Sequence, residues 1–106
     1  MPRYLFRARY TQEGIKGVIK EGGTSRLTAV NELLQSVGGK AEAQYWAFGE
    51  DDYLVIAELP DNVAAAAVAG AVSASGAASV STTVLLTADE IDQVGRRTIE
   101  YRPPGG

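Results

Sequence analysis

The sequence predicts an α+β domain of the ferredoxin-like type, with the order β-α-β-β-α-β, a C-terminal helix and an extended tail. Four segments have strand patterns, namely residues 3–10, 40–48, 53–59 and 77–86. Helical periodicity fills the gaps between the first and second and between the third and fourth of them. Because crossover connections are right-handed, this order predicts one sheet with both main helices on the same face. The 106 residues fit a single domain, 1–106.

The first strand and helices are predicted by residues 3–39. In the strand, one face carries Tyr4, Phe6, Ala8 and Tyr10, and the other carries Leu5, Arg7 and Arg9. Thr11 is a suitable N-cap for a helix with Ile15, Val18 and Ile19 on one face. Gly22-Gly23 should break this helix, and Gly38-Gly39 should end the next one. The second helix has an apolar stripe of Leu27, Val30, Leu33, Leu34 and Val37.

The remaining elements follow from residues 40–106. Strands at 40–48 and 53–59 flank "GEDD", which is typical of a hairpin loop. Pro60 stops the second of these strands, and Asp61 or Asn62 can cap an alanine-rich helix over 63–76. After the strand at 77–86, the capping box "TADE" opens a helix through about Arg97, and the tail is expected to be extended.

Both faces of the predicted sheet are largely apolar. Leu54 and Ile56 lie on one face of their strand, whereas Tyr53, Val55 and Ala57 lie on the other. An antiparallel sheet with one solvated face should instead alternate apolar and polar residues. We therefore expect a second copy of the chain to cover the other face, as a homodimer or a multiple of it.

Composition narrows the chemistry. The chain has no cysteine and no histidine, which excludes disulfides, thiolate nucleophiles and imidazole chemistry, and it implies no cofactor. A net charge of −3 argues against a nucleic-acid binder. Its longest apolar segment, "VAAAAVAGAV", is about half of what a bilayer span needs, so we expect no membrane association and a cytoplasmic location.

Several motifs resemble the GYD domain family of small bacterial proteins. They are "YTQEGIKGVIKEGG", "YWAFGEDDYLVIAELPDN", "AVSASGAASVSTTVLLT" and the "EYRPPG" ending, which together span nearly the whole chain. The resemblance implies a ferredoxin-like fold that associates as a dimeric α+β barrel, and it implies no activity. The family's Gly-x-Tyr-Asp motif is matched at Gly49 and Asp52, but Asp51 stands where the tyrosine would be. A role that requires this phenol is therefore not carried over.

The acidic hairpin and the glycine break are two candidate sites. Glu50, Asp51 and Asp52 could bind a hard cation, but no spaced ligand pattern surrounds them, so we expect a solvated turn and no metal. Asp52 is set apart because it matches the family motif. At the glycine break, five residues at a helix start are candidates for anion binding: Gly22, Gly23, Thr24, Ser25 and Arg26. An ordinary helix kink is the simpler interpretation.

The aromatic residues of the strands form the third candidate site. With Asp52, the residues Tyr45, Trp46 and Tyr53 could line a ligand cleft between sheet and helices, although aromatic residues in strands usually pack. Arg7 and Arg9 could pair with Glu42 or Glu58 across strands or across the dimer, or make an anion site.

Two functions remain open on the sequence. The first is an oligomeric small-molecule-binding or regulatory module. The alternative is a small cofactor-independent enzyme, resembling a monooxygenase or an isomerase, in which Tyr45 or Asp52 moves a proton. A scaffold without a cavity is a third reading.

Overall fold

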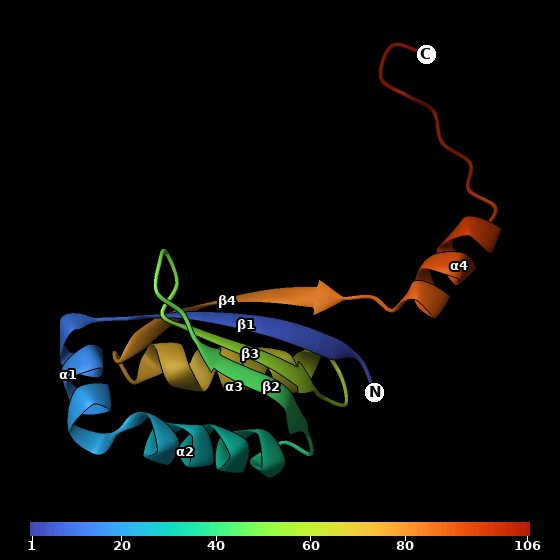
Figure 1. The fold of residues 1–106 in the computed structure, drawn as a ribbon. Helices are drawn as coiled ribbons and strands as arrows, with labels where there is room; N and C mark the ends of the chain where they lie inside the picture. Colours follow the sequence, from blue (N-terminus) through green and yellow to red (C-terminus); the bar gives the residue numbers. More distant parts are fainter.

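The computed structural model describes residues 1–106 and contains one four-stranded sheet with helices against one of its faces (Figure 1). The elements in chain order are β1 (Arg3–Tyr10), α1 (Gln12–Glu21), α2 (Gly23–Ser36), β2 (Lys40–Trp46), β3 (Tyr53–Glu58), α3 (Asn62–Ala74), β4 (Ala78–Leu85) and α4 (Ala88–Arg96). The strand order is β2-β3-β1-β4, and every neighbouring pair is antiparallel. This is the ferredoxin-like arrangement that the sequence predicted.

Strand alternation places the core between the sheet and its helices. On β1, Tyr4 and Phe6 are buried, and the register sets them opposite Ala57 and Val55 of β3, which are buried too. Leu34 of α2 and Val68 of α3 close this core from the helix side, as part of one cluster. The face of β3 that packs against the helices is therefore that of Tyr53, Val55 and Ala57, a choice that the sequence had left open. Leu5, Leu54 and Ile56 lie on the other face, which we call the open face.

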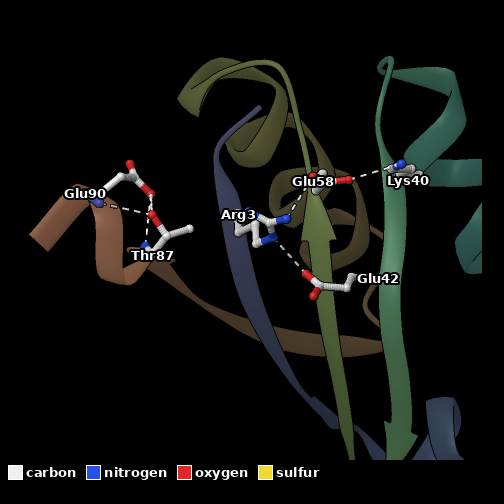
Figure 2. A network of polar contacts seen from close by, with 6 residues as sticks. All are labelled: Arg3, Lys40, Glu42, Glu58, Thr87 and Glu90. Carbon is white, nitrogen blue, oxygen red and sulfur yellow. Dashed lines mark hydrogen bonds and ion pairs between the residues drawn. The ribbon is translucent and has the colours of Figure 1, made fainter.

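Three of the four helices, α1, α3 and α4, begin at a side-chain cap, whereas α2 begins at Gly22 without one. The Thr11 hydroxyl accepts a hydrogen bond from the amide of Gly14, and the Asp61 carboxylate accepts one from Ala64. At α4 the capping box is complete, because the Thr87 amide donates to the Glu90 carboxylate at 3.0 Å while the Glu90 amide donates to the Thr87 hydroxyl at 3.1 Å (Figure 2).

Gly22 makes the predicted break between α1 and α2. Its backbone angles are φ 95° and ψ 151°, in a region that is essentially restricted to glycine. α1 therefore ends at Glu21 and α2 starts at Gly23.

Two details of the predicted elements are wrong. β2 ends at Trp46 and not at residue 48, so Phe48 lies in the hairpin loop with its side chain fully exposed. The connection between β2 and β3 therefore has six residues, 47–52. Its last residue, Asp52, is hydrogen-bonded to the end of β1 through both its backbone amide and its carboxylate. Ile19 was expected on the buried face of α1, but it is 78% exposed, because α1 buries only Val18.

The C-terminal segment forms an arm that leaves the body of the domain (Figure 1). Ile91 and Val94 of α4 are exposed, as are Ile99 and Tyr101 of the tail. The arm accounts for a radius of gyration of 16.8 Å, compared with about 13 Å for a compact chain of this length. None of the helices combines the length and the apolar character needed to cross a bilayer.

Candidate functional site

A cavity of about 560 Å³ lies between the sheet and the helices. α3 packs beside β4, whereas α2 packs beside β2 with α1 next to it, so the two groups of helices cover opposite halves of the sheet. The cavity occupies the space between them. Its wall on the sheet comes from Phe6, Ala8, Tyr10, Tyr53, Val55 and Val80; its helix walls include Gly14, Gly17, Val18, Arg26, Val30, Leu33, Leu34, Val68, Ala71 and Val72.

The lining of the cavity is mostly apolar, but one end is aromatic and polar. Trp46 stacks on Tyr53 with ring centroids 4.4 Å apart and on Tyr10 at 5.9 Å. Tyr10 and Tyr53 both line the cavity, and Trp46 backs them from β2. An offset stack of this kind stabilises packing beyond the area it buries and holds the two phenol rings in place.

A chain of side-chain hydrogen bonds fixes the Tyr53 hydroxyl. It donates to the Gln44 side-chain oxygen, and the Gln44 amide donates to the Asn31 oxygen at 2.7 Å. This chain joins β3, β2 and α2 beneath the aromatic stack. The Tyr53 proton is thus already committed, whereas the Tyr10 hydroxyl has as its neighbour the Arg26 guanidinium, which cannot accept a proton.

Arg26 is the one cationic residue of the cavity lining. It comes from the first turns of α2, and its Nε atom is buried without a hydrogen-bond partner. No acidic side chain lies within ion-pair distance of it. An unsatisfied buried donor costs about 1–3 kcal/mol, and more when it is charged, so a group that accepts from Arg26 would be favoured here.

The two tyrosines are held neutral. Burial raises the pKa of Tyr10, and the nearby positive charge of Arg26 offsets part of that rise. Burial also raises the pKa of Tyr53, with a smaller contribution from Tyr10. Both phenols therefore act as hydrogen-bonding groups at neutral pH and not as bases.

The aromatic site predicted from the sequence is divided by the sheet. Tyr53 lines the cavity and Trp46 supports it, but Tyr45 belongs to the opposite face and is 69% exposed. The reason is strand parity, since neighbouring residues of β2 point to opposite faces. Asp52 lies outside the lining and accepts a hydrogen bond from the Tyr10 amide at 2.8 Å, so it fastens the hairpin to β1.

The five residues of the predicted anion site are also separated. Thr24 and Ser25 are exposed, and the Ser25 hydroxyl donates to the Glu21 carboxylate at 2.9 Å. Gly23 lies against Trp46, since a Cβ placed there would be 3.0 Å from the indole nitrogen. Of the five, Arg26 alone lines the cavity. Anion binding by the exposed part of this turn stays a prediction.

The acids of the hairpin are held in separate contacts. Glu50 accepts from the Arg9 guanidinium through its carboxylate at 3.1 Å and through its carbonyl at 3.0 Å. Asp52 is bound to the Tyr10 amide. No cluster of acids in the structure has the geometry of a metal site. The loop is therefore a turn braced by Arg9.

A charged network crosses one end of the open face (Figure 2). Arg3 lies between Glu42, at 2.9 Å, and Glu58, at 3.3 Å, and Lys40 contacts the other oxygen of Glu58 at 3.3 Å. Arg7 and Arg9 do not meet Glu42 or Glu58 across the strands of one chain, and their pairing across a dimer stays a prediction. The register explains this, because Arg3 is the residue of β1 that lies opposite Glu58.

Sequence reasoning missed the helix walls of the cavity. Val68 and Val72 of α3 and Leu33 of α2 read as ordinary core residues. Gly14 and Gly17 of α1 also line the cavity. Two glycines three residues apart on one helix face were the available signal, since Gly14 lets α1 approach the Ala77 backbone closely and Gly17 leaves space on the same face.

Comparison with known proteins agrees with the motifs. The GYD domain model matches residues 4–94, from the second residue of β1 into α4, and leaves residues 1–3 and 95–106 outside. Neither the curated proteins nor the solved structures include a match to the chain. Because the family model spans most of the 106 residues, the chain belongs to the GYD domain family.

Proposed function

We propose that this protein is an oligomeric module that binds a small, largely apolar molecule between its sheet and its helices. The observation that carries the proposal is the cavity of about 560 Å³, within the range of about 300–1,000 Å³ that is usual for small-molecule sites. Its walls are mostly aliphatic and aromatic, and its few polar groups gather at one end around Tyr10 and Arg26. A scaffold without a ligand would have no need of such a space.

The enzymatic alternative has less support. It relied on Tyr45 or Asp52 as a proton carrier, and neither lines the cavity. Tyr10 and Tyr53, which do line it, have raised pKa values because they are buried, which disfavours the phenolate that a base would need. Binding rather than catalysis is therefore the function proposed.

A neutral fluorescent probe tests the binding function. N-phenyl-1-naphthylamine is apolar and gains fluorescence on leaving water, and we expect saturable binding of one molecule per cavity. Gly17→Trp should abolish it, because Gly17 lines the cavity and has open space where a side chain would start. Gly70→Trp is the matched control, as Gly70 lies in α3 with equal space but outside the lining. Equal binding by both variants would place the probe elsewhere and reject the cavity as the site.

The oligomeric part of the proposal rests on the open face. Leu5, Leu54 and Ile56 form its centre, and Tyr45 stands exposed beside them. The three aliphatic side chains are half-buried in the single chain, and an apolar sheet face of this kind is typical of a protein–protein contact. Arg7 adds to this, since it has no ion-pair partner in its own chain and borders a polar hollow.

A second copy of the chain suits this face. A two-fold axis would bring the apolar centre onto itself, and the free Arg7 of each copy would meet acids of the other. The exposed arm, with Ile91 and Val94, is free to extend the contact. The proposed homodimer, or a multiple of it, is the barrel that the family resemblance implies.

Sedimentation over a wide concentration range tests the dimer. Wild-type protein should sediment as a dimer or a multiple of it at micromolar concentration, and Leu54→Asp should shift it to monomer or aggregate. Val63→Asp is the control, because Val63 of α3 is exposed outside the open face. A wild-type monomer at every concentration would refute the dimer, and so would a Leu54→Asp variant that dimerises normally.

A further inference from the structure

The polar end of the cavity favours a ligand that has a hydrogen-bond acceptor. The Nε atom of Arg26 is buried and donates to nothing in the protein. A guanidinium has donors only, so no rotation of the side chain turns it into an acceptor. Whatever satisfies this group must bring an acceptor, and an anionic oxygen is the strongest one available.

Tyr10 supplies a second donor next to Arg26. Its ring is stacked on Trp46, and its hydroxyl lies beside the Arg26 guanidinium, which can donate to it but cannot accept its proton. Both side chains line the same cavity, and the charge of Arg26 is close enough to act on the Tyr10 hydroxyl. A ligand oxygen at this end could therefore accept from a guanidinium and from a phenol at once.

Two acids in the lining set an upper limit on ligand charge. Glu13 and Glu21 of α1 border the cavity, and both are exposed. Glu13 lies 4.0 Å from Lys16, and Glu21 accepts from Ser25, so neither neutralises Arg26. One half-buried cation flanked by two exposed acids favours a single negative charge and opposes a di- or polyanion such as a nucleotide.

We infer that the ligand is a small apolar monoanion, such as a hydrophobic carboxylate or sulfonate. Its charged oxygens accept from Arg26 and Tyr10, and its body lies on Phe6, Val55 and Val68. This inference rests on the proposed binding function and adds the chemical class of the ligand. It concerns the inner side of α2 and not the exposed turn at Thr24 and Ser25.

Two dyes that differ in one group separate the inference from the proposed function. N-phenyl-1-naphthylamine is neutral, and 1-anilinonaphthalene-8-sulfonate is the same skeleton with a sulfonate. In wild-type protein the anionic dye should bind more tightly than the neutral one, each with a stoichiometry of one. If neither dye binds, the binding function itself fails. If the neutral dye binds and the sulfonate adds nothing, only the monoanion inference fails.

Arg26→Met removes the charge and keeps an apolar stem of similar length. It should weaken the anionic dye by about tenfold or more, the usual worth of a charge-assisted hydrogen bond, and leave the neutral dye within about twofold. Arg97→Met, on the exposed arm, makes the same change in net charge and should alter neither dye. Circular dichroism and the midpoint of urea unfolding verify that each variant is folded.

Arg26→Lys keeps the test decisive if the methionine variant does not fold. It retains the positive charge but loses the planar fork, so the anionic dye should bind with intermediate affinity. An unchanged affinity for the anionic dye in a folded Arg26→Met protein would overturn the inference. Equal losses for both dyes, or the same loss in Arg97→Met, would also overturn it.

Discussion

Replacing Gly14 with alanine should destabilise the protein, although the same change at Gly17 should stabilise it. A Cβ at Gly14 would lie 1.9 Å from the carbonyl oxygen of Ala77, at the start of β4. At Gly17, on the same helix, nothing lies within 4 Å of an added Cβ. The two sites thus receive one methyl group each in opposite environments.

The magnitude follows from the contacts around Ala77. Relief of the overlap to an ordinary 3.4 Å contact needs a movement of about 1.5 Å. The same carbonyl accepts from the Thr11 amide at 2.9 Å and lies 3.2 Å from the Thr11 hydroxyl. Loss of these bonds costs about 1 kcal/mol each, and the gain in helix propensity returns at most ~1 kcal/mol. Gly14→Ala should therefore lose about 1–3 kcal/mol, whereas Gly17→Ala should gain up to ~1 kcal/mol.

Urea unfolding at 25 °C measures both variants. The midpoints should move in opposite directions with an unchanged slope, since the surface exposed on unfolding is nearly the same. Thermal midpoints should differ by roughly 4 °C or more for each kcal/mol. Gly70→Ala in α3 has the same open space as Gly17 and serves as a second reference. Equal stability of the Gly14 and Gly17 variants would refute the close approach of α1 to β4.

Three further predictions concern single polar groups. Burial raises the pKa of Tyr10 and of Tyr53, so the free energy of unfolding should be unaffected below about pH 10 and should fall as the pH rises from the tyrosine pKa of the unfolded chain through that of the folded protein. The chemical shifts of the Tyr Cζ atoms measure this titration. If the pKa of Tyr10 does not rise further in Arg26→Met, the placement of the Arg26 charge is contradicted. Hydrogen bonds from Thr87 lower the pKa of Glu90, so the first turn of α4 should be intact above about pH 4.3 and should fray as the pH falls through the pKa of Glu90 in the folded protein. If the pH dependence of the local amide chemical shifts is unchanged in Glu90→Gln, the capping role of Glu90 is contradicted. Asp52→Ala should cost about 1–2 kcal/mol in urea unfolding, because it leaves the Tyr10 amide without its acceptor; a loss below ~0.5 kcal/mol would remove Asp52 as the anchor of the hairpin.

The fold could be predicted from the sequence because its signals are local. The alternation of Tyr4 and Phe6 with charged or smaller neighbours fixes which face of β1 is buried. The spacing of Thr87 and Glu90 fixes the start of α4, and the capping box is present in the structure. Each of these signals lies within a few residues, so a single sequence contains it in full.

The site could not be predicted in the same way. The cavity depends on the distance between α1 and α3, which are separated in the chain by α2, β2 and β3 and line the cavity from the same face of the sheet. The partner of Arg3 depends on the register between β1, β3 and β2, and the bulge in β2 near Ala41 shifts it again. An apolar residue such as Phe48 continues the apolar pattern of a strand in the sequence even where the hydrogen bonds between the strands have ended. Distances and registers of this kind are tertiary properties.

The break at Gly22 connects the fold to the proposed site. A single helix over residues 12–36 would be about 37 Å long, compared with about 27 Å for the eight residues of β1, so the segment must bend to stay on the sheet. The bend lies beside Trp46 and positions Arg26 in the cavity. Gly22→Ala should cost about 1–3 kcal/mol, because φ 95° with ψ 151° is strained for any other residue. It should also weaken the anionic dye more than the neutral one, since α2 can relieve the strain only by turning Arg26. A variant that loses stability and binds both dyes as wild type does would show that the bend supports the fold alone.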